Sequence, residues 1–538
     1  MKFNDATLAQ IYAANPIKNT WVSANAGSGK TRVLTDRVAR LLLNNTDPQK
    51  ILCLTYTKAA AAEMQNRLFD SLGKWAMLPD EELRTELKSL GENENTLSPD
   101  KIKQARTLFA AALETPGGLK IQTIHSFCDA LLRRFPLEAG VSPQFNMLEE
   151  RQAKQLRIEV VERMAQQSET SEIDMLAKHL TRLNTDDLTN EIVKKRTGFD
   201  IAPTPKDFGI SQDISLDKIF NERINPHNDI INSLIELLKT GSKNDIKAAD
   251  KLREYFLDNT NNTKLKILEK VFLNGKTAKA GPYSAKENVA TLKLIPKTHS
   301  FFDIQSIISK DVEATRKCRL AINAYNKTLV LHSFAQSFLK AYDKRKAFNA
   351  YLDYDDLINL SSKLLTSSSM AQWVLYRLDG GLDHILVDEA QDTSPAQWAV
   401  IDCLAREFTY GISANDRPRS LFIVGDEKQS IYSFQGADPD IFSEKKSEFR
   451  DLFQHINQDM ESRELLYSFR SAPKILSLVD QIFTGENVKN PKSKHKAFHD
   501  SKPGRVDLGR LLKSKINQIR RCGIGQLICP HQMIQNKN

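Results

Sequence analysis

The segment 19–43, NTWVSANAGSGKTRVLTDRVARLLL, determines the fold expected for this chain. It begins with a short β-prone run and ends with apolar side chains at helical spacing. Between them lies ANAGSGKT, residues 24–31, which has the spacing of a phosphate-binding loop with Ala24 in place of the first glycine. A strand, a glycine loop and a helix in this order predict an α/β protein that binds nucleotide phosphates.

The chemistry expected of this loop follows from its residue types. Gly27 and Gly29 allow backbone N–H groups to turn towards phosphate oxygens, and the following helix directs its positive end at them. Lys30 would place its charge on the β- and γ-phosphates, and the Thr31 hydroxyl would bind Mg²⁺. The predicted phosphate site comprises Ala24, Asn25, Ala26, Gly27, Ser28, Gly29, Lys30 and Thr31.

A second apolar run, ILVDEAQD at residues 385–392, ends in two acids. A buried strand of a parallel sheet delivers the carboxylates at its C-terminal end to the ligand-binding edge. Asp388 would hold Mg²⁺, and Glu389 would polarise an attacking water as general base. Thr31 and Asp388 are therefore the predicted metal ligands.

Strand and helix patterns alternate elsewhere in the chain as well. KILCLTYT (50–57) and LKIQTI (119–124) are strand candidates, and a helical pattern follows each. This alternation predicts a parallel sheet with helices on its faces. From about 145 to 340 strand patterns become rare and amphipathic segments dominate, which predicts a large helical insertion.

Length and composition set the broad class. A chain of 538 residues is long enough for two or three domains, and 41% hydrophobic with 27% charged residues is ordinary for a soluble globular protein. No apolar run is long enough for a membrane span, and the acid-containing N-terminus is unlike a secretory signal. The six scattered cysteines lack zinc-site spacing, which predicts reduced thiols in a cytoplasmic protein.

The net charge of +9 gives little information about partners. Residues 508–538 contain six Lys or Arg and no Asp or Glu, which leaves a net charge of +3 for all preceding residues. Most of the excess charge therefore lies in this tail, and the total charge says little about partners.

Five further motifs occur in a fixed order: LTYTKAAAAEM (54–64), IQTIHSF (121–127), VDEAQD (387–392), GDEKQSIYSFQGAD (425–438) and LLYSFRSAP (465–473). Together with Gln10 and the phosphate loop they resemble the UvrD/Rep/RecB group of superfamily-1 DNA helicases. Within that group the chain is most similar to the AddA family of helicase-nuclease subunits, which act in double-strand-break repair and recombination. The resemblance covers about residues 8 to 505.

The resemblance implies an ATP-dependent 3′→5′ DNA helicase or translocase that uses ATP and Mg²⁺. Gln10 resembles the glutamine that reads adenine, and Phe469 matches the position that stacks on it. Arg470 resembles the first arginine finger, which reaches the γ-phosphate. Gln391 and Gln429 resemble residues that couple the nucleotide state to DNA grip, with Gln429 near the γ-phosphate.

The resemblance also implies contacts with single-stranded DNA. Tyr56 and Phe434 match base-stacking positions, with Thr57 and Tyr432 beside them, and stacking suits a motor that moves on any sequence. Tyr56, Tyr432 and Phe434 are also compatible with ordinary core aromatics. His125 and Ser126 fit contacts with the DNA backbone, although a lone histidine is more often simply packed. Gln435 departs from the arginine of UvrD-like relatives, which puts a contact there in doubt.

The implied architecture has two RecA-like lobes. Residues 1–145 and 341–448 would form the first motor domain, 146–340 a 1B-like helical insertion, and 449–507 the start of the second lobe. After Arg470 we find neither a second arginine finger nor nuclease acids, so we expect an incomplete second lobe and weak hydrolysis. Residues 508–538 read as a basic tail, either out of frame or natural. A partner of AddB type is implied, and a membrane is not.

Two other interpretations remain open. Another phosphate-loop NTPase, such as a kinase, would share the loop and the acid pair, but it gives no reason for GDEKQSIYSFQGAD. A non-enzymatic remnant that binds nucleotide or DNA, or one half of a split helicase, would also fit. Phosphoryl transfer to a small molecule would favour the kinase, and the reading frame downstream would reveal a split gene.

Overall fold

The structure is a computed structural model, and it divides the chain into two compact units. Unit 1 contains residues 1–147 and 352–538, and unit 2 contains 148–351. The residues that the structure describes are 3–166, 172–179, 185–212, 214–279, 281–289, 301–366, 371–379, 382–410, 418–431, 437–483 and 495–498.

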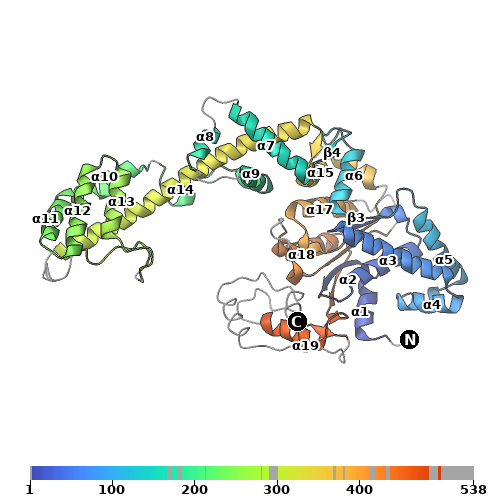
Figure 1. The fold of residues 1–538 in the computed structure, drawn as a ribbon. Helices are drawn as coiled ribbons and strands as arrows, with labels where there is room; N and C mark the ends of the chain where they lie inside the picture. Colours follow the sequence, from blue (N-terminus) through green and yellow to red (C-terminus); the bar gives the residue numbers. More distant parts are fainter. Residues whose placement is uncertain are drawn as a thin grey trace, which may run out of the picture. The chain divides into compact units, whose positions relative to one another are not determined.

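Unit 1 is built around a six-stranded sheet with the order β3-β2-β6-β7-β1-β8 (Figure 1). Every neighbouring pair in it is parallel. The predicted parallel α/β sheet is therefore confirmed. The strands are β1 (Asn19–Ala24), β2 (Ile51–Thr55), β3 (Lys120–Thr123), β6 (His384–Val387), β7 (Ser420–Gly425) and β8 (Met460–Leu465).

Helices cover both faces of this sheet, which explains why β2, β6 and β7 are buried along their whole length. All six residues of β7 are buried, and successive residues of it enter opposite cores: Leu421 and Ile423 on one face, Phe422 and Val424 on the other. The first core also contains residues of α6, α15, α17 and α18, and the second contains residues of α2, α3 and α5.

The helices of unit 1 are α1 (Asp5–Ala13), α2 (Lys30–Leu43), α3 (Lys58–Met77), α4 (Asp80–Ser89), α5 (Pro99–Leu113), α6 (Ile124–Arg134), α15 (Tyr354–Thr366), α16 (Ala371–Asp379), α17 (Pro395–Tyr410), α18 (Pro439–Gln454) and α19 (Pro473–Phe483). Short strands β9 (Tyr467–Ser468) and β10 (Lys496–Ala497) pair in parallel. The segment expected to open a second lobe, 449–507, begins inside α18 and contributes β8 to the sheet described above.

Unit 2 is helical in the residues described, apart from an isolated bridge between Leu273 and Ala285. Its helices are α7 (Glu150–Gln166), α8 (Glu172–Ala177), α9 (Thr185–Lys194), α10 (Leu216–Arg223), α11 (Asn228–Lys239), α12 (Lys243–Leu257), α13 (Asn261–Phe272) and α14 (Phe301–Phe348). Helices α10–α13 gather at one end of α14, and α7–α9 lie along the other. The chain enters this unit after β4 (Asn146–Met147) and leaves it through β5 (Tyr351–Leu352).

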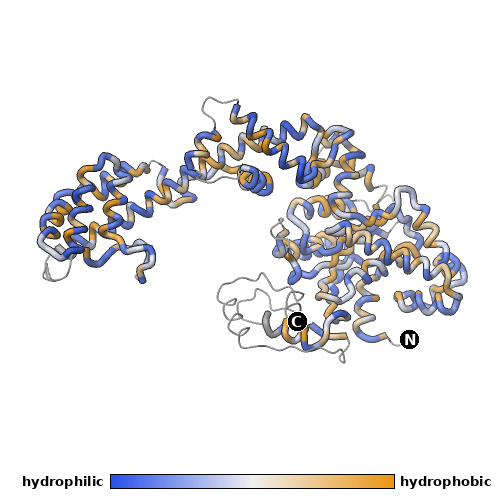
Figure 2. Tube along the Cα trace, viewed as in Figure 1, coloured by the Kyte–Doolittle hydropathy of each residue, from blue (hydrophilic) through white to orange (hydrophobic). Residues whose placement is uncertain are grey.

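The long helix α14 connects two separate hydrophobic cores within unit 2. One contains Ile308 and Val312, and the other contains Phe334, Phe338 and Tyr342. Polar and apolar residues alternate along this helix, as the colouring in Figure 2 shows. Among the described residues, no helix combines the length and the apolar composition needed to cross a membrane.

Candidate active site

The predicted site residues gather at one edge of the sheet. Because all six strands are parallel, the loops that follow their C-terminal ends meet at the same edge, where open α/β sheets bind ligands. The phosphate loop follows β1, Asp388 follows β6, Asp426 follows β7, and Tyr56 follows β2. Four segments that are distant in sequence therefore converge on one edge.

The phosphate loop requires glycine at two positions. Gly27 has a φ of 72° and Gly29 a φ of 88°, and both values lie in the left-handed region that favours glycine. A Cβ on Gly27 would lie 2.8 Å from the Cβ of Arg470, and one on Gly29 would lie 2.6 Å from Nε2 of Gln10. Gly29 is also the N-cap of α2, where no side chain caps the helix. The first N–H groups of α2 thus remain available to an anion.

The loop lysine contacts the acid after β6. Lys30, the first residue of α2, donates from Nζ to Oε2 of Glu389 at 2.6 Å. The side chains of Lys30 and Glu389 are 10% and 34% exposed, so solvent reaches the carboxylate more than the amine. Glu389 adopts a left-handed conformation, with φ 49°. Two segments 359 positions apart are thereby brought within one ion pair.

Asp388 lies at the buried end of β6. Its backbone N–H donates to the carbonyl of Leu54 at 2.8 Å, and its Oδ1 accepts from the N–H of Glu389 at 3.0 Å. Burial, and then the charge of Glu389, raise the pKa of Asp388 to about 7, against the opposing effect of Lys30. A buried carboxylate beside a second one is an environment that a divalent cation would stabilise.

Gln391 connects two loops of the edge. Its Nε2 donates to Oε2 of Glu389 at 2.8 Å, and its Oε1 accepts from the backbone N–H of Asp426 at 2.8 Å. Its carbonyl accepts from the hydroxyl of Ser430 at 3.2 Å. Gln429 in turn donates from its side chain to Oδ2 of Asp426. The two glutamines singled out from the sequence therefore belong to one hydrogen-bonded group.

Asp426 and Asp392 are members of this group that the sequence reasoning missed. Asp426 follows the buried strand β7 in the same way that Asp388 follows β6, so the same pattern of an apolar run ending in an acid could have identified it. Asp392 accepts from Gln391 Nε2 at 3.2 Å, and burial, followed by the charge of Glu389, raises its pKa to about 6.

The segment 465–470 runs along the phosphate loop. The N–H of Asn25 donates to the carbonyl of Leu465 at 3.1 Å, and the N–H of Phe469 donates to the carbonyl of Gly27 at 2.9 Å. The ring of Phe469 packs against Phe498, with 4.4 Å between centroids. The backbone of the exposed Arg470 is therefore fixed beside the loop.

Gln10 reaches the loop from the other side of it. This buried residue of α1 donates from Nε2 to the carbonyl of Ser28 at 2.9 Å. Of the remaining loop residues, Ala24, Asn25 and Ser28 are buried, Thr31 is half-buried and Ala26 is exposed. The structure thus brings Gln10, residues 24–31, Glu389, Phe469 and Arg470 to one place.

The residues present fit a nucleotide with Mg²⁺. Within the described part of the chain, two buried polar atoms of the loop, Asn25 Nδ2 and Ser28 Oγ, have no hydrogen-bond partner. Buried polar atoms usually have partners, so such atoms indicate a place where a ligand supplies them. Uncapped N–H groups and a lysine on one side, and a buried carboxylate on the other, match the donors and acceptors that a magnesium-bound phosphate needs.

The candidate DNA contacts lie at the same edge, farther from the phosphate loop in strand order. Tyr56 is half-buried, and Thr57 is exposed and caps α3, accepting from the N–H of Ala60 at 3.1 Å. His125, on α6 after β3, makes an edge contact with the ring of Tyr354, and burial lowers its pKa. Ser126 shares a 2.9 Å hydrogen bond with Thr123. Tyr432 and Phe434 lie outside the described residues.

Comparisons with known proteins agree with this geometry. Residues 5–450 match the sequence profile of the UvrD/REP helicase N-terminal domain. The chain is 26% identical to an ATP-dependent helicase/nuclease subunit of Staphylococcus carnosus, over 96% of this chain and 42% of that relative. It is 24% identical to the protein of the same name from Clostridium botulinum, over 86% of this chain and 38% of the relative. The chain thus spans less than half the length of these two curated relatives.

Proposed function

We propose, from the premise that the chain belongs to the UvrD/REP helicase family, that it is the ATP-driven motor part of a DNA helicase that acts in double-strand-break repair and recombination. The observation that carries this proposal is the 2.6 Å contact between Lys30 in the glycine loop and Glu389 after β6. It joins the group that would hold the phosphates to the group that would activate water.

The proposed reaction is hydrolysis of the γ-phosphate of ATP. Backbone N–H groups of the loop and Lys30 would bind the phosphates, and phosphate oxygens would replace Glu389 as the partner of Lys30. Glu389 would then be free to polarise a water for attack. Arg470 would stabilise the charge that develops on the transferred phosphoryl group. Gln10 and Phe469 would bind the adenine.

Thr31 and Asp388 would hold the magnesium ion, which neutralises phosphate charge when bound. Gln391 and Gln429 would report the state of the γ-phosphate to the DNA-binding side. The shared contact of both side chains with Asp426 supports this role, because a change at Glu389 reaches both loops through hydrogen bonds.

DNA would cross the edge near Tyr56, Thr57, His125 and Ser126, with Tyr432 and Phe434 completing the path, and the motor would move 3′→5′. Residues 1–145 and 341–448 would form the first motor domain, 146–340 a 1B-like insertion, and 449–507 the start of the second. The relatives are named as subunits of a helicase/nuclease, which supports a partner of AddB type. The site of action would be the cytoplasm.

We expect the polypeptide of 538 residues, purified alone, to bind ATP and single-stranded DNA better than it hydrolyses ATP or unwinds duplexes. Within these 538 residues the resemblance assigns one arginine finger, Arg470, and a finger contributes roughly 10³–10⁵ in rate. Robust unwinding by this polypeptide, or hydrolysis that rises steeply with added single-stranded DNA, would contradict that expectation.

The decisive experiment measures ATP binding and hydrolysis with and without single-stranded DNA. Lys30→Ala should weaken ATP binding, and Glu389→Gln should retain binding while hydrolysis falls on the order of 100-fold. Lys50→Ala is a matched control, because Lys50 also forms an ion pair, with Asp383 at 3.4 Å, and the two side chains are only 16% and 10% exposed. This pair lies just before β2 and β6, at the opposite ends of the strands from the candidate site. If Lys30→Ala and Glu389→Gln both behaved like the wild type, the site would be wrongly assigned.

A further inference from the structure

Two buried arginines of α2 hold the end of α1. Arg37 is fully buried, and its guanidinium donates to the carbonyls of Asn15 and Lys18, the latter at 2.6 Å. It also donates to the hydroxyl of Ser420 at 3.0 Å and lies over the ring of Phe422. All these partners are neutral. Burial lowers the pKa of Arg37 to about 9, which leaves it protonated at neutral pH.

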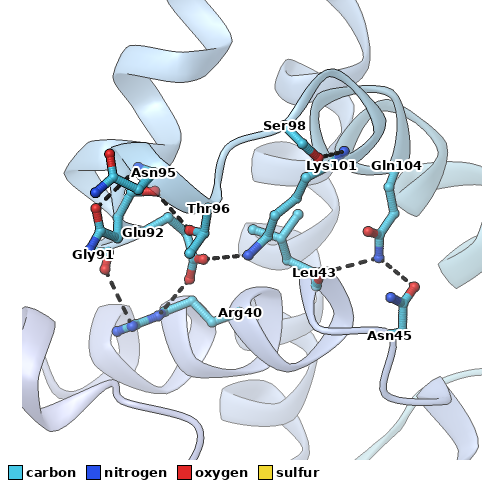
Figure 3. A network of polar contacts seen from close by, with 11 residues as sticks. Arg40, Leu43, Asn45, Gly91, Glu92, Asn95, Thr96, Ser98, Lys101 and Gln104 are labelled. Atoms are coloured by element: carbon cyan, nitrogen blue, oxygen red, sulfur yellow. Dashed lines mark hydrogen bonds and ion pairs between the residues drawn. The ribbon is translucent and has the colours of Figure 1, made fainter.

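Arg40, one turn later, holds α1 itself. Its Nη1 donates to the carbonyl of Ile11 at 3.0 Å. Its Nε donates to Oε1 of Glu92 at 3.3 Å (Figure 3). The other oxygen of Glu92 accepts from Nζ of Lys101 at 2.6 Å. The side chains of Arg40 and Glu92 are only 10% and 8% exposed, so solvent screens their interaction little.

The loop between α4 and α5 also packs closely against α1. Gly91 has a φ of 101°, and a Cβ on it would lie 2.4 Å from Cγ2 of Ile11. Ile11 supplies one of the last four carbonyls of α1, which have no partner within a helix. Arg40 satisfies one of them, and Glu92 fixes the direction of the guanidinium. The segment between α4 and α5 thereby acts on α1 in two ways, by the close approach of Gly91 to Ile11 and through Arg40.

Gln10 is the neighbour of Ile11 and touches the phosphate loop at Ser28. A helix of nine residues is only marginally stable by itself, so its position depends on the tertiary contacts that hold it. Recognition of adenine by a glutamine uses two hydrogen bonds, to N6 and N7, which require accurate placement of the amide. The contact of Arg40 with the Ile11 carbonyl therefore bears directly on where Gln10 lies.

We propose that Arg40, with Glu92 as its counter-ion, is a positioning residue that fixes Gln10 against the phosphate loop and so sets the preference for adenine over other bases. The proposal rests on the proposed function, because it assumes a nucleoside triphosphate in this loop. Neither side chain would touch the nucleotide; each would act through α1. Base preference is thus determined partly by residues of the α4–α5 segment, far from the loop in sequence.

The test compares the dissociation constants for ATP and for inosine triphosphate, which lacks the adenine amino group, in the presence of Mg²⁺. Arg40→Met and Glu92→Gln should each lower the preference for ATP about fivefold or more, towards the value of Gln10→Ala. Binding of inorganic tripolyphosphate, which has no base, should be unchanged. Lys74→Met is the matched control, because it removes the exposed pair of Lys74 with Glu86 in the same region.

A double-mutant cycle separates positioning from general stability. In the Gln10→Ala background, Arg40→Met should cause no further loss of base preference. Arg40→Lys should recover part of the preference, since a single ammonium can reach Glu92 or the Ile11 carbonyl but not both in the geometry of the guanidinium. If Arg40→Met misfolds, Glu92→Gln and Arg40→Lys still give the result.

The outcomes are distinguishable. If wild-type protein binds neither nucleotide in a Lys30-dependent manner, the proposed function fails. If Gln10→Ala abolishes base preference in the wild type while Arg40→Met and Glu92→Gln retain it, the positioning proposal fails and the proposed function stands. Additive effects of Gln10→Ala and Arg40→Met would likewise overturn positioning.

Discussion

The charged side chains at the two edges of the central sheet have different kinds of partner. At the carboxyl edge, Lys30 and Glu389 bind each other and Asp388 lies buried beside them. Two buried side-chain atoms of the loop, Asn25 Nδ2 and Ser28 Oγ, have no hydrogen-bond partner among the residues described. At the amino edge, Arg37 binds backbone carbonyls and Ser420, and Ser420 also binds Nδ1 of His384 at 2.8 Å. Strand β6 takes part in both arrangements, with His384 at its start and Asp388 just after its end.

This difference separates function from stability. A phosphate can replace Glu389 as the partner of Lys30 without any change in the fold, because both are side-chain groups. The partners of Arg37 are carbonyls of the connection between α1 and β1, which cannot move without breaking that connection. Substitutions at the carboxyl edge should therefore change ligand binding, and those at the amino edge should change the free energy of unfolding.

The largest expected effect is that of Arg37→Met on stability. The free energy of unfolding in urea should fall by about 3–5 kcal/mol, because buried carbonyls lose a charged donor. The comparison variant is Lys30→Met, which should cost about 1 kcal/mol or less because Glu389 remains one-third exposed. Equal losses for the two variants would contradict the distinction between the edges.

A second prediction compares two glycines that have similar positive φ angles. Gly27 and Gly117 have φ values of 72° and 77°, so alanine should cost each about 1–2 kcal/mol of stability. Nothing lies within 4 Å of a Cβ on Gly117, whereas one on Gly27 would meet Arg470 and Ser468. Only Gly27→Ala should also weaken ATP binding, by about tenfold or more, as measured by titration calorimetry.

If Gly27→Ala and Gly117→Ala bound ATP equally well, the effect of alanine at Gly27 would come from its φ angle alone and would be an effect on stability. The segment beside the loop would then have no part in shaping the nucleotide site.

A third prediction uses the pH dependence of the amino edge. Burial, and then the charge of Arg37, lower the pKa of His384 from 6.5 to about 3. Below pH 6.5 the unfolded chain therefore binds a proton that the folded chain does not. The contribution of this group to the free energy of unfolding is fully present above pH 6.5, and it falls by about 1.4 kcal/mol per pH unit as the pH drops from 6.5 towards 3.

His384→Asn should remove this slope, because asparagine does not titrate and can still bond Ser420. Urea unfolding of both proteins at pH 7, 6 and 5 would measure it. The stability difference between wild type and variant should shrink as the pH falls. A constant difference would mean that His384 is not held neutral by its surroundings.

Local patterns were sufficient to predict part of the molecule. The glycine loop, the acid pair and the parallel α/β sheet each depend on spacings within a few residues, and the sheet is confirmed. The resemblance to UvrD-type helicases, read from the order of short motifs, is confirmed as well. The proposed roles of Lys30, Asp388 and Glu389 stay predictions, although their side chains are found together.

Other features depend on tertiary contacts that no local pattern contains. Strand β8, MESREL, is buried only at its two end residues and carries three charges, so its sequence does not resemble the apolar strands of the same sheet. The pair of Arg40 with Glu92 joins residues 52 positions apart, and either residue alone reads as a solvated helix charge. The link from Gln391 to Asp426 depends on the neighbouring placement of β6 and β7.

The smallest predicted effect concerns Thr57, which lies at the carboxyl edge of the sheet but makes a hydrogen bond that stabilises a helix end. Its hydroxyl caps α3, so Thr57→Ala should cost about 1 kcal/mol, while Thr57→Asp should keep the cap and the stability. If DNA passes this position, the added negative charge of Thr57→Asp should still weaken single-strand binding a few-fold at low salt, and less at high salt. Ser98 caps α5, which follows no strand, so Ser98→Asp should change neither quantity. Normal DNA affinity for Thr57→Asp would assign Thr57 to the structure alone and leave the DNA path to the other residues of this edge.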